Sequence, residues 1–316
     1  MTETSTIQRF EPGDIFAGAT LLNNPDDDHA GDGRIIQYDG DLNEKGVLWT
    51  EGTTHLLGGL KFAPDGTLWA FDSQAYKVLR ISPEGKQLPY ANFPKRSFSN
   101  VNFAPDGTAI LGEHLVGAEI RLPPDRPLGT KLPFLPGEER FGDGHVFRCT
   151  VDGDVVQEYA TKTHGGMPGF LGVTGSALAP DGKTLIYLSE LGTQVFRYDL
   201  ENDKQLPDLI SYSKDSGMMA MAIGYLPNET LMMIRGNFRE GPKILMLDGE
   251  GNSTREYSME GSGWAALGQT IDNDYALLGN FFTGIVAKFD LNSGEIVARA
   301  ETGVERALAG IAQFPG

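Results

Sequence analysis

The sequence predicts an all-β fold, a six-bladed β-propeller that forms a single domain over residues 1–316. A turn motif recurs along the chain, as FAPDG at 62–66 and 103–107 and as LAPDG at 178–182. Weaker copies start at Leu226 and Ile271, and most successive copies lie 41 to 47 residues apart. A period in the forties with four short strands per repeat is typical of a propeller. The 41 glycines fit many tight turns, and no long helical periodicity interrupts the repeats.

The clearest repeat shows how each blade is expected to form. Strands are predicted at 59–63, 67–72, 76–82 and 86–93, with Pro-Asp-Gly and Pro-Glu-Gly turns after the first and third. Proline presets φ, aspartate bonds its own backbone, and glycine accepts the left-handed conformation. The four segments therefore predict one antiparallel blade.

The two ends of the chain are expected to share a blade. Segments 14–20, 33–41 and 45–52 read as its second, third and fourth strands, and LAGIAQF at 308–314 supplies the missing first strand. Three N-terminal strands and one C-terminal strand would leave no open sheet edge. An insertion at about 121–144, rich in proline and glycine, is expected in the third blade, where a loop of that length would act as a lid.

Composition and charge limit the partners and the compartment. Lys and Arg total 26 against 43 Asp and Glu, a net charge of −17 that disfavours nucleic acid, and no basic run suits an anionic membrane. The N-terminus lacks the apolar core of a signal peptide, and no apolar stretch approaches membrane-spanning length. The single cysteine, Cys149, lies in an alternating strand pattern and is expected to be a buried, inert thiol. These features predict a cytoplasmic protein.

Segments 58–82 and 174–200 carry a family resemblance. They resemble the repeat of the senescence marker protein/gluconolactonase family of six-bladed propellers, which is related to the strictosidine-synthase and NHL-repeat types. The resemblance implies a lactonase or esterase with one divalent metal ion, calcium or zinc. The family repeat places asparagine where this chain has Gly58, Ser99, Thr174 and Met221. We therefore expect the family's usual calcium ring to be absent, because calcium needs several oxygen ligands.

The histidines supply the candidate catalytic residues. All five map to loops on one face of the predicted blades, and His55, His114 and His164 come from neighbouring blades. Histidine beside a carboxylate serves as acid or base near neutral pH, which makes His55, His114 and Glu113 catalytic candidates. The same three residues with His164 are the candidate metal ligands. Arg235 is expected to orient an anionic group, or else to pair with its acidic neighbours.

Apolar residues just before the inner strands predict an oily pocket on the same face. Such a pocket suits an aromatic or terpene-like substrate. Asp72, which ends a second strand, is interpreted as the cap of the next turn, and loop 23–33 as a solvated acidic loop. The candidate substrate-binding residues are Phe98, His164, Phe170, Met219, Trp264 and Asn280.

Three functions remain open from the sequence. The first is a lactonase or esterase-type hydrolase that acts on a hydrophobic or aromatic small molecule. The second is a lyase or isomerase that needs only proton transfer by histidine and glutamate. The third is a propeller that binds a ligand or a protein without catalysis, since fold alone does not determine function.

Overall fold

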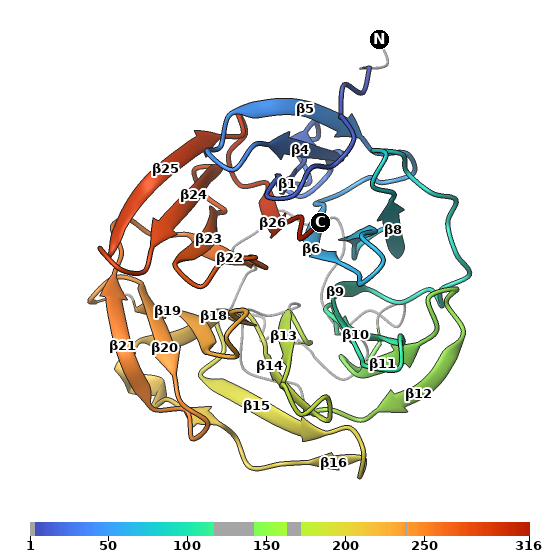
Figure 1. The fold of residues 1–316 in the computed structure, drawn as a ribbon. Helices are drawn as coiled ribbons and strands as arrows, with labels where there is room; N and C mark the ends of the chain where they lie inside the picture. Colours follow the sequence, from blue (N-terminus) through green and yellow to red (C-terminus); the bar gives the residue numbers. More distant parts are fainter. Residues whose placement is uncertain (1–3, 117–141, 163–171, 238) are drawn as a thin grey trace. The chain divides into compact units, whose positions relative to one another are not determined.

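The computed structural model describes residues 4–116, 142–162, 172–237 and 239–316. The chain divides into two compact units: Met1–Tyr90, Leu226–Asn228 and Gly263–Gly316 form the first, and Ala91–Tyr225 and Glu229–Ser262 form the second. Within the described residues the strands build six blades, three in each unit (Figure 1). The predicted fold class, a six-bladed β-propeller, is confirmed. No helix in the described part of the chain is long and apolar enough to cross a membrane.

The first unit contains the blade that joins the two chain ends. Its strand order is β26-β1-β4-β5, with β26 antiparallel to β1, as the sequence predicts. A second blade has the order β6-β7-β8, a third has the order β22-β23-β24-β25, and a short hairpin pairs β2 with β3. The strands are β1 (Ile15–Ala19), β2 (Leu21–Leu22), β3 (Gly31–Asp32), β4 (Arg34–Tyr38), β5 (Glu44–Trp49), β6 (Gly58–Phe62), β7 (Leu68–Asp72), β8 (Lys77–Ile81), β22 (Trp264–Gly268), β23 (Tyr275–Asn280), β24 (Ile285–Asp290), β25 (Glu295–Glu301) and β26 (Leu308–Gln313).

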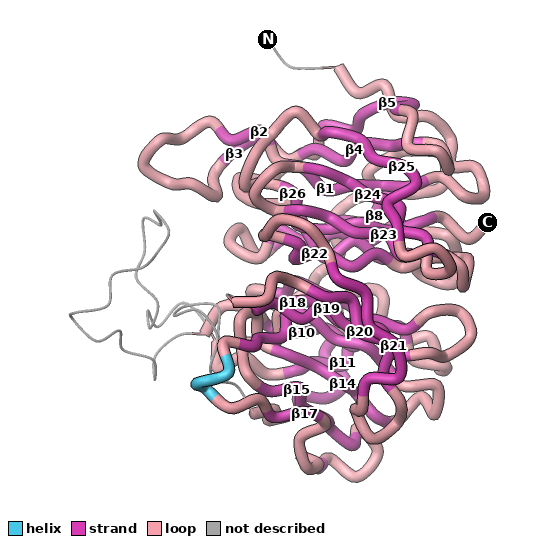
Figure 2. The backbone as a smooth tube through the Cα atoms, turned by 90° about the vertical axis from the view of Figure 1, so that its left-hand side faces the viewer, coloured by secondary structure: helices cyan, strands magenta, loops and turns pink. Residues whose placement is uncertain are grey.

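The second unit contains three blades with the orders β9-β10-β11-β12, β13-β14-β15-β16 and β18-β19-β20-β21. Strand β17 also pairs with β15, and a single 3-10 turn, η1 (Lys214–Ser216), precedes β18 (Figure 2). The strands are β9 (Phe98–Phe103), β10 (Ala109–Glu113), β11 (Val146–Cys149), β12 (Val155–Tyr159), β13 (Gly175–Leu178), β14 (Thr184–Leu188), β15 (Gln194–Asp199), β16 (Lys204–Gln205), β17 (Ile210–Ser211), β18 (Met218–Tyr225), β19 (Leu231–Asn237), β20 (Lys243–Leu247) and β21 (Ser253–Ser258).

The Pro-Asp-Gly turns form as the sequence predicts. Gly66 and Gly107 both have φ of 83°, a conformation that glycine adopts without steric cost. The Asp65 carboxylate accepts the Thr67 backbone N–H at 2.9 Å, and Asp106 accepts that of Thr108 at 3.1 Å. Local side-chain bonds therefore set the hairpin that opens each of these blades.

The predicted fourth strand of the second blade, at 86–93, is wrong. The sheet has three strands, and only an isolated bridge joins Ile81 to Gln87. Pro89 has no N–H to donate to a ladder, which stops the pairing just after Leu88. Tyr90 instead directs its hydroxyl to the backbone oxygen of Glu51 at 2.5 Å.

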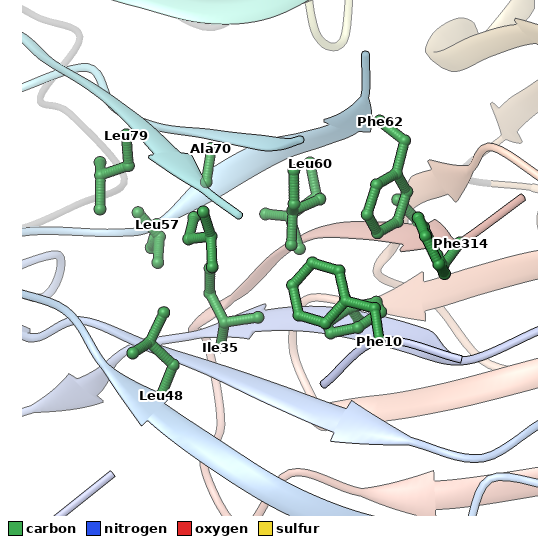
Figure 3. Packing of buried hydrophobic residues seen from close by; sticks show 13 residues of the cluster. Phe10, Ile35, Leu48, Leu57, Leu60, Phe62, Ala70, Leu79 and Phe314 are labelled. Atoms are coloured by element: carbon green, nitrogen blue, oxygen red, sulfur yellow. The ribbon is translucent and has the colours of Figure 1, made fainter. Parts of the chain in front are cut away.

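Aromatic side chains from both chain ends form the core between two blades of the first unit. Phe10 and Phe314 pack against Phe62 of β6, with ring centroids 5.9 and 5.1 Å away (Figure 3). Phe10 and Phe314 also contact each other at 5.6 Å. Tilted and edge-on aromatic contacts of this kind add to the free energy gained by burial. The shared blade is thus fastened by packing as well as by the β1–β26 ladder.

In the second unit, apolar side chains of β10, β14 and β19 fill the spaces between blades. Cys149 on β11 is fully buried, and burial raises the pKa of its thiol to about 11. A thiol with so high a pKa holds little thiolate at neutral pH, so the prediction of an inert cysteine is supported.

Candidate functional site: a histidine and aspartate cluster in the first unit

Two loops of the first unit bring a histidine and aspartate cluster together. The β2–β3 hairpin and its loop extend beyond β1 and β4, and Ala30, at the end of that loop, forms an antiparallel bridge with His55 (Figure 2). The fully buried Asp72 carboxylate holds the segment that carries His55, because its Oδ2 accepts the backbone N–H groups of Thr54 and His55 at 2.8 and 3.0 Å.

The cluster, defined as Asp27, Asp28, His29 and His55, contains two histidine–carboxylate pairs. Nδ1 of His29 lies 2.6 Å from Oδ1 of Asp28, and Nε2 of His55 lies 3.2 Å from Oδ2 of Asp27. The other Asp27 oxygen accepts the His29 backbone N–H at 3.1 Å. Nδ1 of His55 lies 2.8 Å from the Thr54 hydroxyl. These contacts hold both imidazole rings in defined orientations.

Burial distinguishes this cluster from the solvated acidic loop that the sequence predicts. Asp27 is 2% exposed and His29 is 6% exposed. The expectation for loop 23–33 is therefore wrong at these two positions, because the bridge to the His55 segment takes them out of water. Polar groups buried in this way need partners, and the two histidine–carboxylate pairs supply them.

A cationic and aromatic rim borders the cluster. Nη2 of Arg306 lies 3.3 Å from Asp28, and its guanidinium lies 5.9 Å from the ring of the exposed Phe282. The Phe281 ring lies 6.3 Å from His29. Arg306 has φ of 57°, a left-handed conformation uncommon outside glycine that occurs disproportionately at functional sites. The rim offers one charge and two aromatic faces to a ligand.

The His29 ring is suited to accept a proton. Burial lowers its pKa, although the hydrogen bond to Asp28 acts in the opposite direction. A neutral imidazole that donates its Nδ1–H to a carboxylate has Nε2 as its basic nitrogen. This is the arrangement that orients a general base.

The lowered pKa of His29 predicts a pH effect on stability. Between its folded pKa and the ordinary value of 6.5, the unfolded state binds more protons, so the free energy of unfolding falls as the pH drops below 6.5. The share from one histidine is at most about 1.4 kcal/mol per pH unit. Urea unfolding at pH 7.5 and 5.5 should show a smaller loss for His29→Gln than for the wild type. Equal losses in the two proteins would contradict this assignment.

The candidates Glu113, His114 and Arg235 lie in the second unit, whereas His55 lies in the first. Glu113 is fully buried, and its Oε2 accepts the backbone N–H groups of Gly144 and His145 at 3.0 and 3.3 Å. Its Oε1 lies 3.4 Å from Nη1 of Arg96. Burial raises the pKa of the Glu113 carboxyl, while Arg96 and the two amides oppose the shift. Glu113 therefore holds the backbone at Gly144 and His145, and its catalytic role stays a prediction.

Replacing Glu113 by alanine should lower the free energy of unfolding by about 2–4 kcal/mol, because two backbone amides would lose their acceptor. Glu113→Gln, which retains a carbonyl oxygen, should lose less. Circular dichroism during denaturation measures both variants. A Glu113→Ala protein as stable as the wild type would show that these amides do not depend on the carboxylate.

The candidate substrate-binding residues that the structure describes contact other side chains and backbone groups of the protein. Phe98 is buried with its ring 5.6 Å from that of Phe147, and Met219 is 6% exposed on β18. Trp264 pairs with Asn280 across β22 and β23, and Asn280 Oδ1 accepts the N–H groups of the two residues beyond Phe281. His164, Phe170 and most of the insertion predicted at 121–144 lie outside the described residues. Asp72 caps its turn as interpreted, since its Oδ1 accepts the N–H groups of Gln74 and Ala75 at 3.2 and 2.9 Å.

The sequence contained one signal that could have identified Asp28 and His29. They are adjacent, like Glu113 and His114, and the same argument of a histidine beside a carboxylate applies to both pairs. The three aspartates at 26–28 favoured the solvated interpretation instead. No local pattern points to Arg306, which reaches Asp28 from the other end of the chain.

No protein-family model and no curated protein matches this chain. Among solved structures, it is similar to a catalytically inactive histidine-to-alanine variant of virginiamycin B lyase from Staphylococcus aureus with quinupristin. The identity is 16%, the TM-score is 0.52, and the match covers 94% of this chain and 92% of the lyase. A streptogramin B lyase structure has 15% identity and a TM-score of 0.54, with coverage of 96% and 93%.

A nidogen/laminin complex is also similar, with 12% identity, a TM-score of 0.63, and coverage of 96% of this chain and 98% of the matched chain. These neighbours are six-bladed β-propellers, and at such low identity they establish the fold alone. Membership of the gluconolactonase family stays a prediction.

Proposed function

We propose that this chain is an enzyme that removes a proton from a small organic molecule, in the manner of a lyase or isomerase. The observation that carries the proposal is the buried His29 ring, held through Nδ1 by Asp28 at 2.6 Å, beside a second histidine–carboxylate pair. Two oriented histidines allow one group to accept a proton and another to return it.

Each residue of the cluster and its rim has its own role in an elimination reaction. His29 accepts the proton of a substrate C–H bond, and the electrons of that bond form the new double bond. The leaving oxygen departs with the electrons of its bond to carbon and takes up a proton from the second histidine of the cluster, His55. Asp28 orients His29 and stabilises its charged form. Arg306 and Phe282 favour a substrate with an anionic or aromatic group near the reacting carbon.

Two structural neighbours support the lyase class, whereas the nidogen/laminin complex is a protein-binding neighbour. The first two are named as lyases, and the variant with one histidine replaced by alanine is described as catalytically inactive. A histidine is therefore important for activity in a lyase of this fold. The cytoplasmic location predicted from the sequence also suits a small-molecule enzyme.

A second candidate is metal-assisted hydrolysis of a lactone or ester. Asp27, Asp28 and His29 offer ligand atoms within 4.8 Å of one another, a mixture of oxygen and nitrogen that suits zinc better than calcium. A bound zinc ion would lower the pKa of a water molecule and supply the nucleophile. The Arg306 guanidinium opposes this candidate, because it already pairs with Asp28.

Isotope labelling separates the two reactions. The protein is incubated in H₂¹⁸O with a panel of aryl-substituted alkyl esters and lactones in which the saturated carbon that bears the leaving oxygen has an acidic C–H on its neighbouring carbon, and the products are analysed by mass spectrometry. Elimination gives an unsaturated product without ¹⁸O, whereas hydrolysis incorporates ¹⁸O. Turnover without ¹⁸O that survives EDTA is expected. Incorporation of ¹⁸O that depends on added zinc would favour the hydrolase, and no turnover of any panel member would favour a binding protein.

A further inference from the structure

Arg235 is a buried cation in the second unit, and the reaction assigned to His29 does not use it. It lies on β19, opposite Ala220 of β18 and Lys243 of β20. It shares a face of β19 with Met233, which belongs to the core that also includes Tyr212. Its side chain is only 8% exposed. A guanidinium stays charged at any ordinary pH, so its burial requires compensation.

The compensation is incomplete along one edge of the guanidinium. Nε and Nη2 of Arg235 are buried, and neither has a hydrogen-bond partner among the residues that the structure describes. Nη2 of Arg235 lies 3.9 Å from Oε2 of Glu240, which is beyond hydrogen-bond distance, and Glu240 is 59% exposed. An unsatisfied buried charged group of this kind is costly and calls for an explanation.

The neighbouring strand places a second cation beside Arg235. Residues directly opposite in an antiparallel pair point to the same face, so Arg235 and Lys243 lie side by side on one face of the sheet. Glu256 pairs with Lys243, with Nζ and Oε2 2.8 Å apart, and the charge of Arg235 also acts on Glu256. Neither Glu240 nor Glu256 supplies a hydrogen bond to Nε or Nη2 of Arg235. This edge of the guanidinium therefore has two buried donors that an anion could satisfy.

We propose that the Nε–Nη2 edge of Arg235 binds the carboxylate of a small organic anion. Nε and Nη2 present two parallel N–H donors, which match the two oxygens of a carboxylate in a bidentate pair. The half-buried Tyr212 provides an apolar neighbour for the body of that anion, and Arg235 acts on it electrostatically. Phosphate presents similar oxygens but lacks the apolar body, so benzoate should bind more tightly.

Titration of the whole protein with benzoate, and separately with inorganic phosphate, tests this proposal by calorimetry and by NMR of the arginine Nε–H signals. Benzoate should bind, shift the Nε–H signal of Arg235, and bind at least tenfold more weakly to Arg235→Gln. Arg235→Lys should also bind more weakly, because a lysine cannot form the bidentate pair. Arg239→Gln, which removes an exposed arginine four residues away, should bind like the wild type.

The NMR measurement uses the wild-type protein, so the test does not depend on whether the variants fold. Preferential binding of phosphate would replace the organic carboxylate with a phosphate-bearing ligand. An unchanged Nε–H signal with both probes, or equal benzoate affinity in Arg235→Gln, would overturn the proposal. Because the readout is binding to the second unit, failure here leaves the isotope experiment on the first unit unaffected.

Discussion

Replacing Asp72 by alanine is expected to lower the free energy of unfolding by about 3–5 kcal/mol, the largest stability effect that we predict. Its two oxygens accept four backbone N–H groups, two before β6 and two after β7. Alanine would leave those donors without their acceptor, and the polypeptide that carries His55 would lose its anchor. All three tryptophans lie in the first unit, so tryptophan fluorescence during urea denaturation reports this loss.

Asp65→Ala is the matched control for Asp72→Ala. Asp65 is an exposed turn aspartate whose carboxylate accepts the backbone N–H of Thr67. Its removal should cost less than about 1 kcal/mol, because water can replace a single exposed acceptor. If the two variants lost equal stability, the buried position of Asp72 would not explain its effect.

Replacing His29 by glutamine should reduce turnover of the substrate found with the ester and lactone panel by about 10²–10⁴-fold, the usual contribution of a general base. Glutamine retains a hydrogen-bond donor toward Asp28 but cannot accept a proton near neutral pH. The defect should appear in kcat, because the proton transfer occurs in the transition state. Steady-state kinetics with parallel unfolding curves distinguishes this loss from a loss of folded protein.

His145→Gln is the control for His29→Gln. His145 also contacts a carboxylate through Nδ1, at 2.7 Å from Glu158, but this pair lies in the second unit and Glu158 is 45% exposed. The His145 variant should retain the wild-type kcat. Equal turnover in the His29 variant and the wild type would remove His29 from the reaction.

Local chemistry explains why the blades could be predicted. A Pro-Asp-Gly turn depends on bonds within a few residues, such as that between Asp65 and Thr67, and alternating apolar residues report a strand without knowledge of its partner. The shared blade followed from counting strands, and the β1–β26 ladder confirms it. The fourth strand beside β8 was predicted from the four-strand repeat, although Pro89 disfavours a strand at that position, and the structure lacks it.

The candidate site could be predicted only in part, because burial depends on contacts between distant residues. His55 was identified from its loop, but its partner Asp27 was assigned to solvent. The triple aspartate run is hydrophilic when read along the chain, and Asp26 is exposed, but Asp27 is buried where Ala30 bridges to His55. Glu113 accepts two backbone N–H groups, a contact that the sequence could not reveal, because a carboxylate that binds backbone amides has the same sequence signature as a catalytic one.

The sequence by itself determined the repeat, its turns and the blade that joins the chain ends, because these depend on short-range backbone preferences. Only the tertiary structure decided which polar residues meet. Arg306 reaches Asp28 across 278 positions of sequence, and the Nε–Nη2 edge of Arg235 is buried through its place beside Lys243 and the packed core. Such contacts arise from the packing of strands distant in sequence, whose side chains carry no local mark of their future neighbours.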